Sequence, residues 1–178
     1  MKYKDQLNRE INIPTLLQRI ISLVPSQTEL LYDLGLKDRI VGQTIFCVHP
    51  SEYFKSSIKI GGTKKLNLEK IASLNPDLII ANKEENEKDQ IEQLSKDFPV
   101  WISDVNTLED ALGMIKSIGE ITETQNKASK IINQITQSRN DFLKQLKQKQ
   151  SVIYLIWNNP YIAVGTDTFI NTMLTEAG

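Results

Sequence analysis

The stretch from Lys59 to Ala81, KIGGTKKLNLEKIASLNPDLIIA, constrains the fold most, because a glycine turn, a capped helix and a buried strand follow one another directly. Gly61 and Gly62 permit backbone conformations that other residues disfavour. Asn67 is a good helix N-cap, and the apolar residues after it recur at helical spacing. The run LIIA from Leu78 to Ala81 is typical of a parallel strand covered on both faces. Because open α/β sheets bind ligands beyond the carboxyl ends of such strands, the stretch predicts a ligand-presenting unit.

Strand-like and helix-like segments alternate along the first 120 residues. A short strand or hairpin is expected over residues 5–13, ending at Pro14. Further strands are expected at 19–24, 40–41, 78–81 and 100–102, with helices at 27–34, 68–74, around 91–94 and from 107 to about 119. This order predicts an α/β fold with a mostly parallel, Rossmann-like sheet.

A long helical pattern from Thr122 to Gln148 follows, without glycine or proline. At about 1.5 Å per residue it would span roughly 40 Å, which suits a strut between two lobes. Beyond it, residues 152–157 and 161–164 read as a strand and its return strand, and a last helix ends at Gly178. We therefore expect an N-terminal α/β lobe over 1–120, a linking helix over 121–149 and an incomplete C-terminal α/β lobe over 150–178.

Composition excludes several classes of function. Acidic and basic residues nearly cancel, 22 against 21, so charge gives no support to nucleic-acid binding. No GxSxG elbow, P-loop, GxGxxG or HExxH motif is present, and the chain has no second histidine to build a Ser-His or Cys-His relay. Asp77, Asp104 and Asp110 lie where turns or caps favour aspartate. We expect no enzyme and no intrinsic cofactor.

The chain carries no signal that fixes its location. No stretch approaches the roughly 20 apolar residues of a membrane span. The first 14 residues carry charges where a secretory leader would have its apolar core, so either a leader was removed or none exists. The single cysteine leaves the redox compartment open.

The segments RIISLVPSQTELLYDLGL, KIGGTKKLNLEKIASLNPDLIIANKEEN, VWISDVNTLEDAL and YLIWNNPYIAVGTDTFINTML resemble the substrate-binding proteins of bacterial ABC importers for cobalamin, haem and iron-siderophores. Within that class the chain is similar to the helical backbone metal receptors, whose two α/β lobes are joined by one long helix. The resemblance implies capture of an iron chelate (siderophore), haem or corrinoid as cargo, delivery to a membrane permease, and a periplasmic or cell-surface location. An intracellular binding or interaction module of the same fold is the alternative, so a cytoplasmic location stays open.

The loops at the strand ends indicate the same ligand site as the resemblance to the substrate-binding proteins. The expected ligand-binding residues are Ser26, Gln27, Phe46, Cys47, His49, Thr63, Lys64, Lys65, Asn82 and Lys83 from the first lobe, and Trp157 and Asn158 facing them from the second. Cobalamin-binding members grip the macrocycle with aromatic side chains, but only Phe46 is aromatic at the matching positions here. That departure favours a polar or anionic chelate, with the three lysines supplying charge-assisted contacts unless they are simply solvated.

Two further features invite specific roles. Cys47 and His49 form a CxH pair, and in an extended loop both side chains would point the same way, towards one soft or borderline metal. A packed thiol and a histidine bonded to backbone explain the same pair without a metal. Glu69 matches a surface glutamate that pairs with permease arginines in the family, although a carboxylate in a first helical turn also stabilises the helix dipole. An unfinished C-terminal sheet makes self-association through strand edges plausible.

Overall fold

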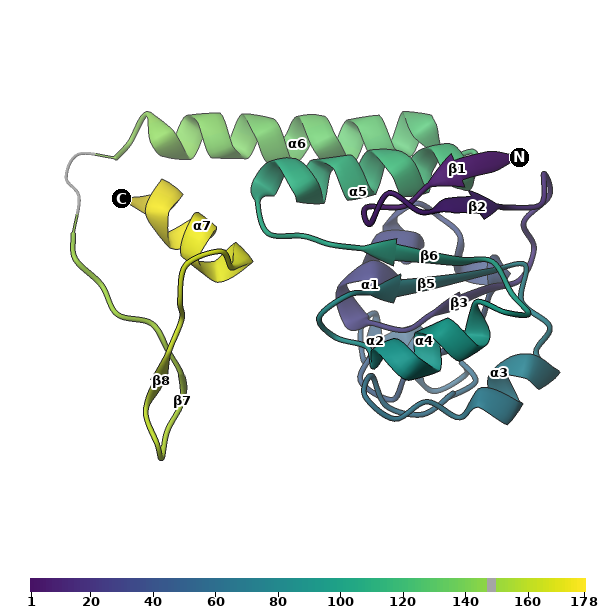
Figure 1. Ribbon diagram of the computed structural model, residues 1–178. Helices are drawn as coiled ribbons and strands as arrows, with labels where there is room; N and C mark the ends of the chain where they lie inside the picture. The colour runs from purple at the N-terminus through teal and green to yellow at the C-terminus, as the bar shows by residue number, and fades with distance from the viewer. Residues whose placement is uncertain (147–149) are drawn as a thin grey trace.

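A four-stranded parallel sheet forms the centre of the protein (Figure 1). The computed structural model describes residues 1–146 and 150–178. The strand order is β4-β3-β5-β6, with β3 at Ile20–Ser22, β4 at Ile40–Gln43, β5 at Leu78–Asn82 and β6 at Val100–Ser103. Ile20 pairs with Leu78, and Ile79 pairs with Val100. The predicted α/β class and the predicted strands are confirmed.

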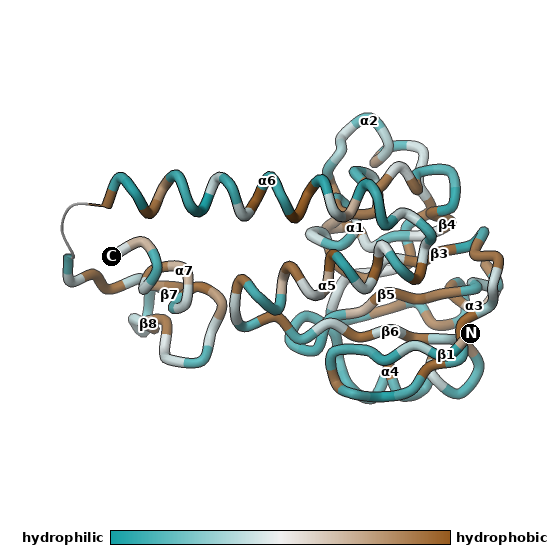
Figure 2. Tube along the Cα trace, turned by 90° about the horizontal axis from the view of Figure 1, so that it is seen from above, coloured by the Kyte–Doolittle hydropathy of each residue, from teal (hydrophilic) through white to brown (hydrophobic). Residues whose placement is uncertain are grey.

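Helices cover both faces of this sheet, as the apolar runs of β3, β5 and β6 require. On one face lie α1 (Pro25–Asp33) and α5 (Leu108–Ile121), whose apolar side chains pack with those of Ile20, Leu78 and Trp101. On the other face lie α3 (Leu68–Ser73) and α4 (Lys88–Leu94), packed with the side chains of Ile79 and Ile102. Figure 2 shows the hydrophobic colour concentrated along β5 and β6.

The turns and caps follow the sequence closely. Gly61 has a φ of 105°, and a Cβ there would lie 2.5 Å from the carbonyl oxygen of Lys65, so only glycine fits this turn. Asn67 caps α3 by accepting a hydrogen bond from the backbone N–H of Lys70 at 2.9 Å. Two short helices that the sequence did not predict, a 3₁₀ turn at Lys37–Arg39 and α2 at Ser51–Phe54, flank β4 and the loop after it.

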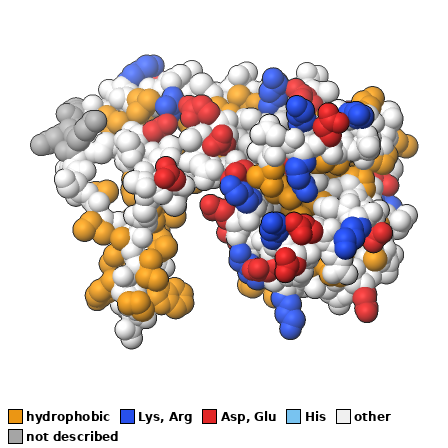
Figure 3. Space-filling view, in the orientation of Figure 1, with side chains coloured by type: hydrophobic (Ala, Val, Ile, Leu, Met, Phe, Trp, Pro, Cys, Tyr) orange, Lys and Arg blue, Asp and Glu red, His pale blue; other side chains and the backbone are white. Residues whose placement is uncertain are grey.

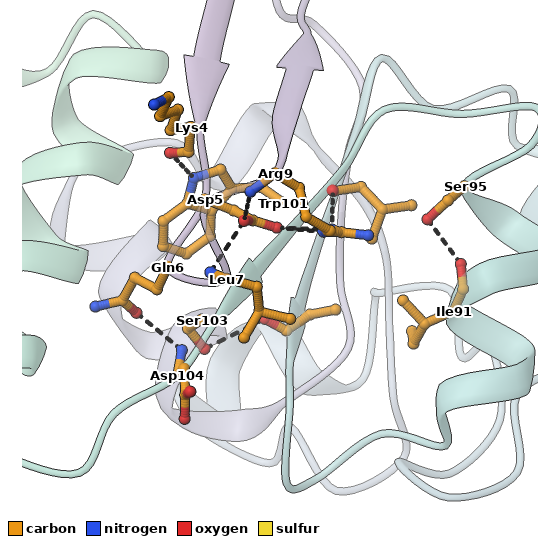
Figure 4. Close-up of polar contacts among 12 residues, drawn as sticks. Lys4, Asp5, Gln6, Leu7, Arg9, Ile91, Ser95, Trp101, Ser103 and Asp104 are labelled. Atoms are coloured by element: carbon orange, nitrogen blue, oxygen red, sulfur yellow. Dashed lines mark hydrogen bonds and ion pairs between the residues drawn. The ribbon is translucent and has the colours of Figure 1, made fainter.

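An N-terminal hairpin of β1 (Lys2–Lys4) and β2 (Glu10–Asn12) covers the outer edge of β6. Its loop is organised by the buried carboxylate of Asp5, which accepts hydrogen bonds from the backbone N–H groups of Leu7 and Arg9 and from the Arg9 guanidinium (Figure 4). The indole of Trp101 donates to the carbonyl of Lys4 at 3.2 Å. The backbone N–H of Gln6 donates to the carbonyl of Ile102, so the hairpin satisfies part of an otherwise open strand edge.

The linking helix is shorter than the sequence predicts. Glu123, with a φ of 60°, ends the preceding segment, and α6 runs over Gln125–Leu143, 19 residues or about 28 Å. It packs against α5, where Gly119 permits close approach: a Cβ there would lie 2.5 Å from the Cβ of Ala128. Beyond α6 the side chain of Leu146 is exposed, and residues 147–149, including the predicted end of the helix at Gln148, lie outside the described residues.

The C-terminal segment holds a small hairpin and a helix beside α6. The hairpin joins β7 (Leu155–Trp157) to β8 (Ile162–Ala163), and α7 spans Phe169–Ala177. Thr172 donates to the carbonyl of Asn106, and Arg139 on α6 forms a bidentate ion pair with Glu176 at 2.7 and 2.9 Å. These elements match the predicted strands and final helix, whereas the division of the chain into lobes stays a prediction. Within the described ranges, no helix combines the length and apolarity needed to cross a membrane.

Candidate functional site

The carboxyl ends of the four parallel strands meet at one edge of the sheet, as predicted. Each strand ends in a polar residue, and these four residues are Ser22, Gln43, Asn82 and Ser103. Three of them are buried, and Asn82 is half-buried. Because buried polar groups need hydrogen-bond partners, this edge contains an internal polar network rather than a row of free side chains.

Gln27 lies at the centre of that network. Its side chain, 1% exposed, reaches from the first turn of α1 to donate to the carbonyl of Ala81 at 3.3 Å and to the hydroxyl of Ser103. The side-chain oxygen of Gln27 has no hydrogen-bond partner among the described residues. The sequence predicted a ligand contact here, but the structure places Gln27 beneath the surface, while Ser26 beside it is exposed.

Asn82 and Asn86 hold the loop after β5 in place. The Asn82 oxygen accepts from the N–H groups of Glu84 and Glu85 at 2.9 and 3.0 Å, and its amide donates to Ser103 at 3.0 Å. Asn86 accepts from the N–H of Asn82 and donates to the carbonyl of Thr63 at 3.0 Å. Asn82 is therefore occupied in shaping the loop, and Thr63 is buried. Sequence reasoning missed Asn86 and Ser103; the Asn-rich turn after an apolar run was the available signal for Asn86.

Two of the three predicted lysines are already paired. Lys83 donates to the Asp104 carboxylate at 2.7 Å, and this hydrogen bond raises the pKa of the Lys83 ammonium. Lys64 donates to the carbonyl of Glu84 at 2.6 Å and lies 3.7 Å from the Glu87 carboxylate. Lys65 is exposed. Two of the three lysines thus make contacts within the protein, while the side chains of Lys64 and Lys83 stay 57% and 53% exposed.

The loop after β4 separates Cys47 from His49. The Cys47 side chain is fully buried, and its sulfur lies 3.1 Å from the hydroxyl oxygens of both Thr28 and Thr44. His49 is exposed. The expectation that both side chains point the same way is wrong, because the loop turns at Cys47, whose N–H donates to the carbonyl of Thr44. The alternative of a packed thiol fits Cys47, and no cluster of three or more His, Cys, Asp or Glu side chains suited to a metal occurs in residues 1–146 and 150–178.

The hairpin residues Trp157 and Asn158 lie across open space from the strand ends. Trp157 is 62% exposed, and Asn158 beside it is exposed. Figure 3 shows a gap between the apolar hairpin and the main body of the protein. The predicted residues therefore fall on two sides of this gap, and the described part of the chain gives no hydrogen bond that joins Trp157 or Asn158 to the strand-end loops.

Glu69 lies apart from this edge, in the first turn of α3. Its side chain is exposed, and α3 lies towards the other end of the sheet from the strand-end loops (Figure 1).

Comparison with known proteins shows to which family a chain with this arrangement belongs. The model of a periplasmic binding protein family matches residues 20–178. The chain belongs to the periplasmic binding protein family. It is 33% identical over 181 residues to the ABC transporter substrate-binding lipoprotein YvrC of Bacillus subtilis, covering 96% of this chain and 57% of that protein. It is 28% identical to the vitamin B12-binding protein of Vibrio campbellii, covering 90% of this chain and 59% of that protein.

Solved structures agree with this membership. The vitamin B12-binding protein BtuF of Vibrio cholerae superposes with a TM-score of 0.81 and 25% identity, over 91% of this chain and 64% of that one. The siderophore-binding protein BauB superposes with a TM-score of 0.86 over all of this chain and 66% of that one, although at 19% identity it shows the fold alone. These relatives are binding proteins rather than enzymes, as the sequence predicted. The chain spans less than two thirds of the length of each.

Proposed function

We propose that this periplasmic binding protein family member captures a metal-containing cargo, an iron chelate, haem or corrinoid, and delivers it to the permease of an ABC importer. The observation that carries the proposal is the convergence of four strand ends at one sheet edge, opposite the exposed hairpin tip with Trp157. Open α/β sheets bind ligands at this position. The relatives named for vitamin B12 binding support the same class of cargo.

Titration of the chain with haemin, cyanocobalamin and a ferric hydroxamate siderophore tests the proposal. Trp157 is exposed and Trp101 is fully buried, so quenching at the hairpin can be separated from quenching in the core by the variant Trp157→Phe. Saturable binding of one cargo, with part of the quenching lost in Trp157→Phe, is the expected result. Failure of all three ligands to bind would refute the capture function.

We propose that Glu69 is one of the contacts to the permease. Its exposure in the first turn of α3 supports this role. Glu69→Lys should weaken binding of the chain to its permease while leaving cargo affinity unchanged. Glu92, an exposed glutamate on α4, supplies the matched control as Glu92→Lys. Equal permease binding by the wild-type chain and Glu69→Lys would contradict the assignment.

Two further proposals concern the state of the protein. An extracytoplasmic location is supported by family membership and can be tested by fractionating cells that express the native gene. Self-association through the C-terminal hairpin is supported by the exposure of its apolar side chains, which is 76% at Tyr161 and 62% at Trp157. Light scattering over a range of concentrations should show dimers, and a monomer at every concentration would exclude this association.

A further inference from the structure

The segment of residues 48–58, which we call the flap, lies between two anchored ends. None of its side chains is buried, whereas Cys47 before it and Ile60 after it are fully buried. The backbone of Gln43 joins the two ends, because its N–H donates to the carbonyl of Ile58 at 3.0 Å and its carbonyl accepts from Ile60 at 3.1 Å. Figure 2 shows this segment, with α2, projecting beyond α1 and β4. A loop with a closed base and no buried side chain can open without unfolding the rest of the protein.

The hydrogen bonds of residues 48–57 are local. In the described part of the chain, each of them has its partner within residues 46–59. The N–H of Tyr53 donates to the carbonyl of Pro50 at 3.1 Å, and the N–H of Ser57 donates to the carbonyl of Tyr53 at 3.1 Å. These bonds shape the tip of the flap, but they do not attach the tip to the body of the protein.

The aromatic ring of Tyr53 makes that attachment. It stacks on the ring of Tyr32, which belongs to α1, with the centroids 4.8 Å apart and the ring planes inclined by 9°. The ammonium of Lys37, in the 3₁₀ turn after α1, lies 5.4 Å from the centroid of the Tyr53 ring. Stacking and the cation–π contact are both attractive, and both depend on the ring of Tyr53 rather than on its hydroxyl.

Tyr32 is a fixed base for this stack. Its hydroxyl donates to the side-chain oxygen of Gln43 at 3.3 Å, and the Gln43 amide donates to the carbonyl of Cys47 at 2.8 Å. Burial, with smaller effects of Cys47 and Tyr53, raises the pKa of the Tyr32 hydroxyl, which therefore stays protonated as a donor. The stack thus connects the tip of the flap to the same glutamine that closes its base.

We propose that Tyr53 is a latch: its ring holds the flap against α1, and its release from Tyr32 lets the flap open as one unit about the base at Gln43. The flap follows the carboxyl end of β4, at the rim of the candidate site, and carries the exposed side chain of His49. Opening widens the approach to the strand ends, and closure slows the departure of a bound cargo. This consequence for cargo rests on the proposed capture function, whereas the latch itself does not.

Hydrogen exchange of the cargo-free 178-residue chain, followed by mass spectrometry, tests the latch. Tyr53→Ala should lower the protection of flap peptides by about tenfold, the combined effect of losing the stack and the cation–π contact, while the protection of β5 stays unchanged. Tyr53→Phe keeps the ring and should behave as wild type. Lys37→Ala removes the cation alone and should lower the protection of the flap by about threefold. Tyr161→Ala is the matched control, since Tyr161 is 76% exposed and lies in the C-terminal hairpin.

The exchange pattern decides on the latch. Loss of protection that is confined to the flap in Tyr53→Ala and absent in Tyr53→Phe and Tyr161→Ala supports it. Unchanged protection in Tyr53→Ala overturns it. A loss spread equally over the flap and β5 reports a general loss of stability and also overturns it.

Stopped-flow dissociation measures the consequence for cargo, with whichever of haemin, cyanocobalamin and a ferric hydroxamate siderophore the chain binds. The cargo should leave Tyr53→Ala about tenfold faster than wild type, and Tyr53→Phe should restore the slow rate. Equal rates in wild type and Tyr53→Ala would overturn the role of the flap in cargo exchange. Failure of all three ligands to bind refutes the capture function, whereas the exchange experiment still decides on the latch because it uses no cargo.

Discussion

The buried carboxylate of Asp5 should contribute far more stability than any exposed charge of the N-terminal hairpin. Its side chain is 0% exposed and accepts from Leu7 and Arg9 backbone N–H groups at 3.0 and 2.9 Å, and from the Arg9 guanidinium at 2.7 Å. Asp5→Ala leaves two partly buried backbone donors unpaired and removes the bond from the guanidinium. At about 1 kcal/mol for each bond from a backbone N–H and slightly more for the bond from the guanidinium, the loss of unfolding free energy should be about 3 kcal/mol.

Urea unfolding monitored by tryptophan fluorescence measures this loss. Trp101 is fully buried and donates to the carbonyl of Lys4 in the same hairpin, so detachment of the hairpin should also shift its emission to longer wavelength. A Trp157→Phe background removes the exposed tryptophan. Glu10→Ala is the control, because the Lys2–Glu10 pair has side chains 72% and 62% exposed and should contribute less than about 1 kcal/mol. Equal midpoints for Asp5→Ala and Glu10→Ala would refute this reasoning.

Two other predictions concern the helices. Gly119→Leu should destabilise the protein by about 1–3 kcal/mol in the same urea assay, because its Cβ would collide with the Cβ of Ala128. Gly113→Leu, where an added Cβ meets no atom within 4 Å, should be neutral or stabilising, and equal effects of the two substitutions would count against the close helix contact. The hydrogen bond from Arg139 lowers the pKa of the Glu176 carboxyl. This ion pair should therefore stabilise α7 at a pH above 4.5, the ordinary glutamate pKa, and lose its effect as the pH falls below that value. The hydrogen-exchange protection factors of α7, which correct for the intrinsic pH dependence of exchange, should then fall on acidification in wild type but not in Glu176→Gln, and parallel pH profiles would contradict the assignment.

The sequence predicted the elements whose signals are local. Near neighbours in the sequence determine the turn at Gly61, the helix cap at Asn67 and the buried strand at residues 78–81, and the structure confirms all three. The linking helix is shorter than predicted at both ends: Glu123 adopts a positive φ, so α6 begins at Gln125 rather than at Thr122, and α6 ends at Leu143. Side-chain periodicity does not reveal such a backbone turn.

The sequence predicted the position of the sheet edge more reliably than the surroundings of the side chains on it. Strand ends mark an edge of the sheet, and an apolar run shows where each strand ends. Which side chains stay free at that edge depends on partners that are distant in sequence, such as Asp104 for Lys83 and Ser103 for Gln27. Cys47 illustrates the same difficulty, because its burial depends on Thr28 from another element. Tertiary hydrogen bonds, rather than residue type, therefore decide which predicted residues can reach a ligand.

The burial of Cys47 has a practical consequence for watching the protein at work. A shielded thiol reacts slowly with maleimides, so the natural sequence already behaves as a cysteine-free background for site-directed labelling. Cysteines introduced at exposed positions on either side of the gap, for example Lys65→Cys and Asn158→Cys, can then carry a pair of spin labels or fluorophores. The distance between the two probes would report directly on how the hairpin moves relative to the sheet when cargo arrives.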